Sequence, residues 1–412
     1  MLRRTGWPCL ALILGTLVLI ASTSAALIGA SGTVEQQPQI GVDCDPSRLS
    51  GPLKVLCLAK RFEEGRRLFE EETFGGNGRT CDTCHSARTG TFSPKDAQRR
   101  LARNPADPLF LHDGLDDGIQ GTSRITEHAT VRIEIPLTSR VRLFNDPLAT
   151  SVVFLRGTPT TINTPALQPV FMYDGRDTTL ETQALGAVHA HAQNGVEPTA
   201  LQLQLIADFQ RTAPRFFSSL ELFAFARGGA PPQLPLGRTA SEKRGRAMFD
   251  NVPFDGVTTR GLCNTCHSGP MLNRFGPGNP FGGPPGGRRA GIGINERNLI
   301  GNPLYTFIVT NPDGTVVVVT TPDPGAMLND PPPSAPPGVP TPPRSFFANL
   351  FKIPTLWGVK DTAPYFHDNS AKTLEDVAEH YAFFFLTSPS TRGFIFTEQD
   401  QADMVAFLKL LR

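Results

Sequence analysis

Apolar residues recur at helical spacing in several separate stretches of the chain, and this periodicity predicts a mainly helical protein. The first stretch, from about 48 to 72, has leucines and phenylalanines on one face and ends before the glycines at 75, 76 and 78. The other stretches cover residues 178–193, 199–212, 239–250, 373–386 and 397–411. The last of them begins with a Thr-x-x-Asp cap, which is typical of a helix start.

Strand signals lie between these helices. Residues 131–137, inside a long insertion that runs from 86 to 156, alternate apolar with charged or polar positions and predict a short β-ribbon. Two β-prone runs at 304–310 and 315–321 flank the turn sequence Asn-Pro-Asp-Gly and predict a hairpin. The proline-rich segment at 322–343 is expected to be extended or mobile.

The segment from 228 to 235 separates two groups of helices. Its glycines and prolines are poorly tolerated by both helices and strands. With 412 residues and 39% apolar content, the chain is long enough for two units that each have a core. We therefore predict an N-terminal domain at 45–228 and a C-terminal domain at 238–412.

Each predicted domain carries one Cys-x-x-Cys-His motif. The motif residues are Cys81, Cys84 and His85 in the first domain and Cys263, Cys266 and His267 in the second. Two thiols one helical turn apart can add to the two vinyl groups of a haem, and the adjacent histidine can ligate the iron. A redox dithiol would not need the histidine, and a zinc site would pool four ligands in one cluster.

A repeated approach sequence supports the haem interpretation. The segment Gly-Arg-Arg-Leu-Phe at 65–69 precedes the first motif, and Gly-Arg-Ala-Met-Phe at 245–249 precedes the second. The motif therefore belongs to a duplicated unit. We predict two covalently attached c-type haems in a mainly α fold, with two cytochrome c-like haem domains, a short β-hairpin and irregular insertions.

The N-terminus has the three parts of a secretory signal peptide. Arg3 and Arg4 precede an apolar run at 9–21 and small residues at 22–26. We predict a signal peptide at 1–26 and export to the periplasm. Because weak apolar character continues to Ala30, the alternative is an uncleaved N-terminal anchor, the one case in which we expect contact with a membrane. The net charge of +1 falls to about −1 without the two arginines and does not indicate a nucleic-acid partner.

Cysteine use agrees with export. Of the seven cysteines, Cys9 lies in the predicted signal peptide and four belong to the haem motifs. Cys44 and Cys57 remain, 13 residues apart. In an oxidising compartment we expect a disulfide that pins the N-terminal segment to the first helix, and the alternative is two unrelated thiols.

Several further motifs occur in a fixed order along the chain. They are Arg156-Gly-Thr-Pro-Thr160, Tyr173-Asp-Gly-Arg176, Leu180-Glu-Thr-Gln-Ala184, Ile353-Pro-Thr-Leu356, Thr362-Ala-Pro-Tyr-Phe-His-Asp368 and Thr373-Leu-Glu-Asp-Val377. Together they resemble the dihaem cytochrome c peroxidase family, including its relative MauG, which matures the cofactor of methylamine dehydrogenase. The resemblance implies that the haem on His85 reacts with peroxide, while the haem on His267 stores and passes electrons.

The resemblance also implies a distal pocket at the first haem. Gln183 matches the family's glutamine, whereas the family's glutamate position falls on Gln193, with Glu197 four residues beyond. A helix through Gln183 would place Ala187 and His191 on the same face. His191, or alternatively His189, is therefore a candidate proton-transfer group or sixth ligand, and a purely structural histidine is the other interpretation. His112 and His128 in the insertion are weaker ligand candidates.

For the second haem, the position at which the peroxidases have a methionine ligand and MauG has a tyrosine holds Tyr381. We take Tyr381 as the candidate axial ligand. The alternative is that Tyr381 is a core aromatic residue and that Met327, Met271 or His380 ligates the iron. A phenolate ligand would favour ferric iron and lower the potential relative to methionine.

Two further family positions differ here. Tyr173 stands where family members have a tryptophan between the haems, so that its oxidation would be coupled to proton loss. Gly157 stands where the family commonly has an asparagine contributing to an interdomain calcium ion, although Thr362 and Pro364 match the backbone-carbonyl contributors.

The resulting functional hypothesis is an exported peroxidase. A small electron-donor protein, either a cytochrome c or a copper protein, would supply electrons for hydrogen peroxide reduction, or a protein substrate would be oxidised as MauG does. The alternative from another class is a non-catalytic dihaem electron-transfer cytochrome in which both irons are six-coordinate.

Overall fold

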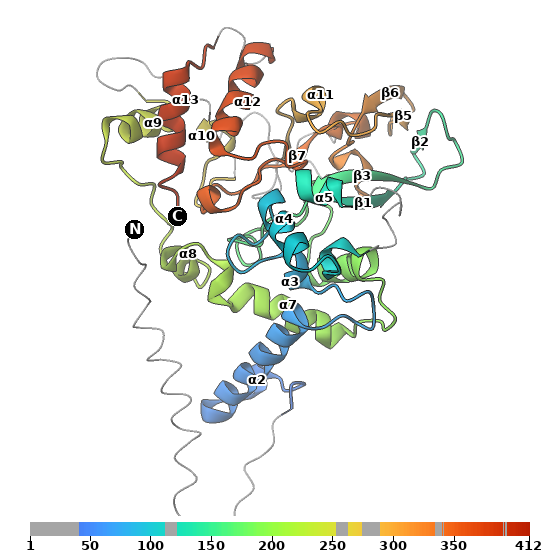
Figure 1. The fold of residues 1–412 in the computed structure, drawn as a ribbon, viewed down its shortest axis with the longest axis vertical. Helices are drawn as coiled ribbons and strands as arrows, with labels where there is room; N and C mark the ends of the chain where they lie inside the picture. Colours follow the sequence, from blue (N-terminus) through green and yellow to red (C-terminus); the bar gives the residue numbers. More distant parts are fainter. Residues whose placement is uncertain are drawn as a thin grey trace, which may run out of the picture.

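The structure is a computed structural model that describes residues 41–111, 122–252, 263–273, 289–333, 340, 342–389, 391 and 394–412. The predicted signal peptide at 1–26 and His112 lie outside these residues. Within them the fold is mainly helical, as predicted (Figure 1). None of the helices that the structure describes combines the length and apolar character needed to cross a bilayer.

The N-terminal helical unit is built on two long helices, α2 (Gly51–Glu70) and α7 (Ala200–Thr212), which pack against each other. α6 (Leu180–Ala187) packs against α7, and Phe69, Phe209 and Phe216 belong to the core of this unit. The predicted disulfide is confirmed, because Cys44 is bonded to Cys57 on α2. Shorter elements complete this half of the chain: α3 (Cys81–Cys84), α4 (Pro94–Arg103), α5 (Ser123–His128) and α8 (Leu220–Phe225).

The C-terminal helical unit has a corresponding pair, α9 (Ala240–Asp250) and α13 (Glu398–Leu408). α12 (Leu374–Thr387), α10 (Cys263–Cys266) and α11 (Ile294–Arg297) lie in the same half of the chain. The glycine of the repeated approach sequence lies at the helix crossing in both units. A Cβ at Gly65 would meet the Leu205 carbonyl at 2.3 Å, and one at Gly245 would meet that of Asp403 at 2.0 Å. The duplication therefore preserves a close helix–helix contact.

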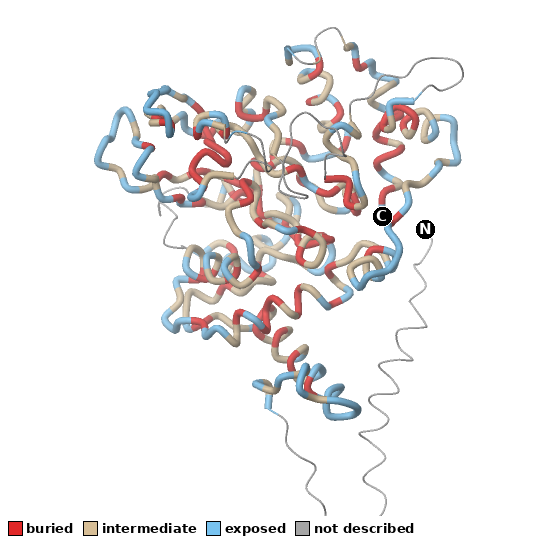
Figure 2. Tube along the Cα trace, turned by 180° about the vertical axis from the view of Figure 1, so that it is seen from behind, coloured by how far each residue is buried: buried red, intermediate tan, exposed pale blue. Residues whose placement is uncertain are grey.

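Both halves of the chain contribute strands to a separate core. β1 (Thr130–Pro136) pairs with β3 (Ser151–Gly157), which confirms the predicted ribbon. β5 (Tyr305–Thr310) and β6 (Val316–Thr321) form the predicted hairpin, and β2 (Val141–Leu143) adds to its free edge at β5. Their side chains share one core, and Figure 2 shows buried residues running through the middle of the molecule.

Two local expectations are met only in part. The helix predicted at 178–193 is α-helical only to Ala187 and continues as a π-helical turn at Val188–Ala192. The proline-rich segment is not uniformly extended, since a 3₁₀ turn at Ala326–Leu328 places Met327, fully buried, in the core beneath the strands. Residues 229–237 contain neither helix nor strand, and the domain limits at 228 and 238 stay a prediction.

Candidate functional site

Both Cys-x-x-Cys-His motifs open into one continuous cavity of about 1640 Å³. The N-terminal wall includes Cys81, Cys84 and His85, and the C-terminal wall includes Cys263, Cys266 and His267. Apolar side chains such as Phe69, Phe74, Leu374 and Phe385 make up much of the remaining surface. A large apolar cavity with a few fixed polar groups is the usual character of a cofactor site.

The two motif histidines are held in the same way. Nδ1 of His85 lies 2.8 Å from the carbonyl oxygen of Gly90, and Nδ1 of His267 lies 2.7 Å from that of Leu272, five residues further along in each case. Because a carbonyl oxygen only accepts, Nδ1 carries the proton and Nε2 keeps its lone pair. Burial lowers the pKa of both imidazoles, that of His267 to about 4. A neutral imidazole with a fixed Nδ1 is the form that ligates iron.

The four motif cysteines suit covalent haem attachment. α3 and α10 each place two thiols one turn apart, and none of the four is in a disulfide. Burial raises the pKa of Cys81 and of Cys263 to about 12, so both remain thiols at neutral pH. The thiols, the neutral imidazoles and the apolar walls together fit two c-type haems.

The first motif is anchored by Arg215. Its guanidinium lies 2.6 Å from Oδ1 of Asp82 and donates to the carbonyl oxygen of His85 at 3.2 Å. It also pairs with Glu70 at the end of α2. The motif helix is therefore tied to two helices of the core rather than lying on a free loop.

Gln183 and His191 both line the cavity, and Ala187 lies between them on the same wall. The carbonyl oxygen of His191 accepts from Nδ2 of Asn77 at 2.9 Å, so the π-helical turn is held in place. Since π-turns often occur at functional sites, this turn agrees with a site role for His191.

The other distal candidates do not reach the cavity. His189 is exposed, and its Nε2 lies 2.9 Å from Oε1 of Glu197, which is exposed as well. Gln193 is exposed too, and His128 at the end of α5 is not among the residues of the cavity wall. The family's glutamate therefore has no counterpart at Gln193 or Glu197.

One carboxylate on this wall was missed from the sequence. Glu72, just beyond α2, lines the cavity and accepts from Nη1 of Arg67 at 2.8 Å. The hydrogen bond from Arg67 lowers the pKa of Glu72, so it stays ionised at neutral pH. A charge run at a helix end normally indicates a solvated surface, and nothing in the sequence pattern separates Glu72 from its neighbours.

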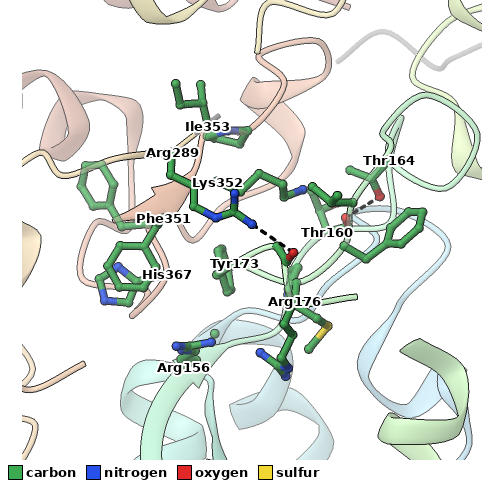
Figure 3. A pocket seen from close by; sticks show the side chains of 18 of the residues that line it. Arg156, Thr160, Thr164, Tyr173, Arg176, Arg289, Phe351, Lys352, Ile353 and His367 are labelled. Carbon is green, nitrogen blue, oxygen red and sulfur yellow. Dashed lines mark hydrogen bonds between the residues drawn. The ribbon is translucent and has the colours of Figure 1, made fainter. Parts of the chain in front are cut away.

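A group of aromatic and charged side chains lines another part of the shared cavity (Figure 3). The ring of His367 stacks on Phe351 at 3.7 Å between centroids, and the ring of Tyr173 lies 6.5 Å from it. Burial raises the pKa of Tyr173 and lowers that of His367, so both are neutral at pH 7. Tyr173 thus lies on the wall of the cavity that both motifs share, and its interhaem role stays a prediction.

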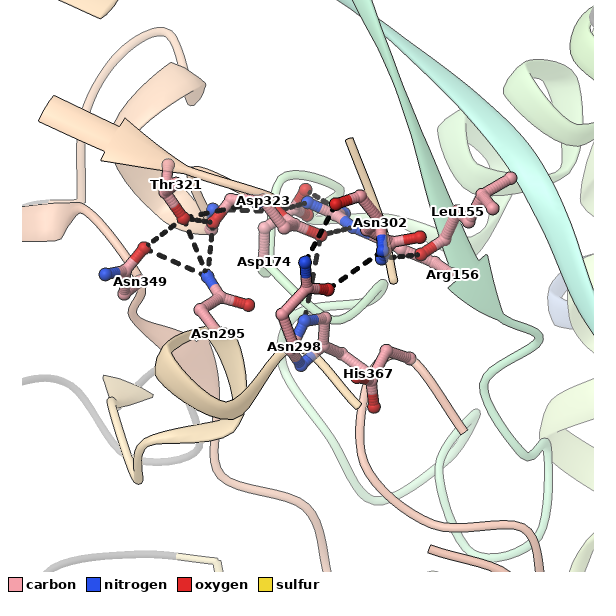
Figure 4. Close-up of polar contacts among 12 residues, drawn as sticks. Leu155, Arg156, Asp174, Asn295, Asn298, Asn302, Thr321, Asp323, Asn349 and His367 are labelled. Atoms are coloured by element: carbon pink, nitrogen blue, oxygen red, sulfur yellow. Dashed lines mark hydrogen bonds and ion pairs between the residues drawn. The ribbon is translucent and has the colours of Figure 1, made fainter. Parts of the chain in front are cut away.

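Buried ion pairs hold this region together (Figure 4). Arg156 on β3 contacts Asp174 at 2.6 Å and Asp323, just beyond β6, at 2.7 Å, with all three side chains almost fully buried. Nearby, Asn302 donates to the carbonyl oxygen of Leu155 at 3.3 Å. These contacts join the N-terminal half of the chain to the C-terminal half and fix the wall between the motifs.

At the second motif, Tyr381 on α12 lines the cavity, and its pKa is raised by burial and by the nearby Cys266 and Cys263.

The alternative ligands are less well placed. Both ring nitrogens of His380 have other partners, because Nε2 lies 2.6 Å from the carbonyl oxygen of Ile292 and Nδ1 lies 3.3 Å from Arg297. Met271 and Met327 are buried in hydrophobic cores away from the cavity wall.

Met404 on α13 lines the cavity as well, and the sequence interpretation did not include it. Its position in an ordinary apolar helix pattern gave no signal that it faces a cofactor site. The axial role of Tyr381 stays a prediction.

The residues at the family's calcium position do not fit a calcium ion. A Cβ at Gly157 would lie 2.1 Å from Oδ1 of Asn369, so the Asn369 side chain occupies that space. Nδ2 of Asn369 donates to the carbonyl oxygens of His128 at 3.1 Å and Ala129 at 2.9 Å. An amide donor satisfies carbonyl oxygens that a cation would otherwise attract. The part of the chain that the structure describes has no cluster of three acidic, histidine or cysteine ligands.

Comparison with known proteins agrees with the sequence resemblance. Residues 59–227, which include the first motif, match the family model described as di-haem cytochrome c peroxidase. This match confirms the resemblance for that part of the chain. No curated protein sequence matches the chain significantly.

Several solved structures are similar over most of their length. A MauG-like protein associated with microbial copper homeostasis is 20% identical, with 85% of this chain and 88% of that chain covered and a TM-score of 0.45. The diheme peroxidase BthA from Burkholderia thailandensis is 16% identical, with 89% and 88% covered and a TM-score of 0.47. Hydrazine synthase from Kuenenia stuttgartiensis is 14% identical, with 93% and 98% covered and a TM-score of 0.41.

Proposed function

We propose that this protein is an exported dihaem c-type peroxidase, with peroxide reduced at the His85 motif and electrons passed through the His267 motif. One observation carries the proposal: the two motifs share a cavity, and each histidine has its Nδ1 at a carbonyl oxygen, which leaves Nε2 of the neutral ring unprotonated. The family match over residues 59–227 supports the peroxidase class. When bound, haem supplies an iron centre at which the O–O bond of peroxide is cleaved with two electrons.

Residues of the cavity wall near the first motif would transfer protons during this reaction. O–O cleavage requires a proton on the leaving oxygen, and an imidazole is the side chain best suited to move one near neutral pH. Gln183 on α6 and His191 in the π-helical turn both line the cavity, where they can bind peroxide and transfer this proton. Glu72 is ionised and paired, so it supplies negative charge rather than a proton.

Tyr173 would relay electrons between the two motifs. Because its phenol is neutral, losing an electron forces it to lose a proton as well. His367 is buried, neutral and next to the Tyr173 ring, so it is the group placed to accept that proton. Electron transfer through this wall would then be coupled to a short proton transfer.

The oxidising equivalents have two proposed uses. A small cytochrome c or copper protein would reduce the protein in each cycle, or a protein substrate would be oxidised as MauG does. Tyr381 favours the second use, since a tyrosinate ligand stabilises the ferric state more than a methionine does. This assignment rests on Tyr381 facing the second motif.

A non-catalytic electron-transfer cytochrome is the second candidate function. It is favoured by the position of Gln193 and Glu197, both exposed, which leaves the distal wall without the family's acid. In that case His191 would be a sixth ligand that closes the first iron to peroxide.

Rapid mixing with hydrogen peroxide separates these functions. Fully ferric and half-reduced protein are each mixed with one equivalent of peroxide while optical spectra are recorded. Prompt loss of the ferric high-spin bands supports the peroxidase, and reaction in the fully ferric state indicates the MauG-like mode. Unchanged spectra in both states contradict the peroxidase and leave the electron-transfer cytochrome.

A further inference from the structure

Arg289 and Lys352 form a pair of like charges on the cavity wall. They are directly opposite each other in the two-residue ribbon of β4 (Arg289–Ala290) and β7 (Phe351–Lys352). Both side chains line the cavity, and both point into it in Figure 3. Arg289 donates to the carbonyl oxygens of Asp174 at 2.7 Å and Gly175 at 3.1 Å. Like charges opposite each other in an antiparallel pair are destabilising, and a negative charge beside Lys352 would reduce this cost.

The neighbouring carboxylate is already shared. Among the described residues, the charged groups that act on Lys352 are Arg289, which lowers its pKa, and Asp174, which raises it. Asp174 is in ion pairs with Arg156 at 2.6 Å and Arg176 at 2.8 Å. Burial is the larger effect and brings the pKa of Lys352 to about 8, which shows how poorly its charge is compensated.

A second observation indicates an acceptor at the same place. The ammonium of Lys352 contacts Oε1 of Gln168, whose side chain is only 6% exposed and also lines the cavity. Nε2 of Gln168 is buried and makes no hydrogen bond within the described structure. A buried donor without an acceptor costs about 1–3 kcal/mol, so a ligand oxygen is expected beside it.

We propose that Lys352, Gln168 and Arg289 form a carboxylate subsite that binds a propionate of one of the two haems. The inference rests on haem binding at the two motifs. The propionates are the charged groups of a haem, and the subsite lies between the motifs on the cavity wall that both share. Two segments of the cavity wall contact the motifs. The hydroxyl of Thr160 donates at 2.6 Å to the carbonyl oxygen of Thr89, which precedes Gly90, the hydrogen-bond partner of His85. Pro354, two residues after Lys352, contacts His267.

The assignment makes Lys352 and Gln168 positioning residues that affect a haem potential. Removing a positive charge beside a propionate stabilises the ferric haem relative to the ferrous haem, so the midpoint potential falls. We therefore expect Lys352→Met to lower the midpoint potential of one haem, whereas Lys352→Arg keeps it near the wild-type value. Lys372→Met, which removes an exposed lysine, is the matched control and should leave both potentials unchanged.

The test is redox titration of the fully haem-loaded protein, with the potential of each haem followed in its own optical bands. Resonance Raman spectra of the same samples report the propionate bending modes, which should shift in Lys352→Met and in Gln168→Leu. A shift at either haem that Lys372→Met lacks supports the subsite. Equal potentials and unshifted propionate modes in both variants would overturn it.

Two controls keep the outcomes separate. Haem content of the wild-type protein is measured first, because a chain without two c-type haems contradicts the proposed function itself. Acetate is then added to the wild-type protein to test for a free carboxylate as the natural occupant. A saturable change in potential with acetate would show an open subsite and overturn the propionate assignment, whereas no change supports it.

Discussion

The imidazole of His85 donates from Nδ1 to the carbonyl oxygen of Gly90 at 2.8 Å, and this contact orients Nε2, the nitrogen that we propose binds iron. Gly90 has a positive φ of 65°, and a Cβ there would lie 2.6 Å from both Oγ1 of Thr160 and the backbone nitrogen of Thr161. The loop can present its carbonyl to His85 only because residue 90 has no side chain.

We expect Gly90→Ala to displace this carbonyl and destabilise the protein by about 1–3 kcal/mol, with altered spectra of the first haem only. Gly314→Ala is the matched control, since Gly314 also has a positive φ, of 83°, but has open space around it. The measurement is the free energy of unfolding together with the optical spectrum. Equal losses in the two variants would contradict a specific role for the Gly90 loop.

His189 and His191 provide a matched pair on one helical turn. His191 lines the cavity, whereas His189 is exposed beside Glu197. We expect His191→Gln to slow the reaction with peroxide by about 10²-fold, a typical loss for a removed proton-transfer group. His189→Gln should react at the wild-type rate. Stopped-flow mixing with peroxide measures both, and a slow His189 variant with an unaffected His191 variant would reverse the assignment.

Among the described residues, Tyr381 and Met404 both line the cavity, and each could serve as the sixth ligand of the second haem. We expect Tyr381→Phe to change the ferric spectrum of that haem and to raise its midpoint potential, because a phenolate stabilises ferric iron. Met404→Leu should preserve both. Electron paramagnetic resonance of the ferric proteins checks this, and a spectrum that changes only in Met404→Leu would identify the methionine as the ligand.

Asn369 fills the space over Gly157, the position at which the family resemblance implies a calcium ligand. We expect treatment with a calcium chelator to leave the melting temperature unchanged and metal analysis to find no stoichiometric calcium. Asn369→Asp, which sets a carboxylate against the carbonyl oxygens of His128 and Ala129, should destabilise the protein by about 2–4 kcal/mol in metal-free buffer. A chelator-induced fall in the melting temperature of the wild-type protein would show that the cation is present after all.

Asp174 should make stability depend on acid pH. Burial alone would raise its pKa, but Arg176 and Arg156 outweigh that effect and hold it below the ordinary value of 3.8. A lowered folded-state pKa gives stability that is complete above about pH 4 and is lost as the pH falls further. Asp174→Asn should cost about 3–5 kcal/mol at pH 7, because Arg156 and Arg176 lose a buried partner. Urea unfolding at pH 7 and below pH 4 measures this, and a wild-type-like acid response in the variant would contradict it.

The sequence by itself determined the local elements and predicted the attachment chemistry. Helical periodicity, caps and turn residues predicted α2, α7, α9, α12, α13 and the β5–β6 hairpin, because these signals act between residues close in the chain. The spacing within Cys-x-x-Cys-His is also local, so the two motifs could be recognised without a fold. The disulfide between Cys44 and Cys57 could also be predicted without a fold, because they were the two cysteines that neither the haem motifs nor the predicted signal peptide used.

Only the tertiary structure decided how these parts combine. The two motifs share one cavity because the two halves of the chain pack against each other. The same packing places His191 on the cavity wall and leaves His189 exposed. The burial of Met327 depends on long-range contacts to the strands, which no local proline signal reports. Asn369 fills the space over Gly157, and Lys352 contacts Gln168. The residues of each pair are far apart in the sequence, so hydrophobic periodicity cannot predict these contacts.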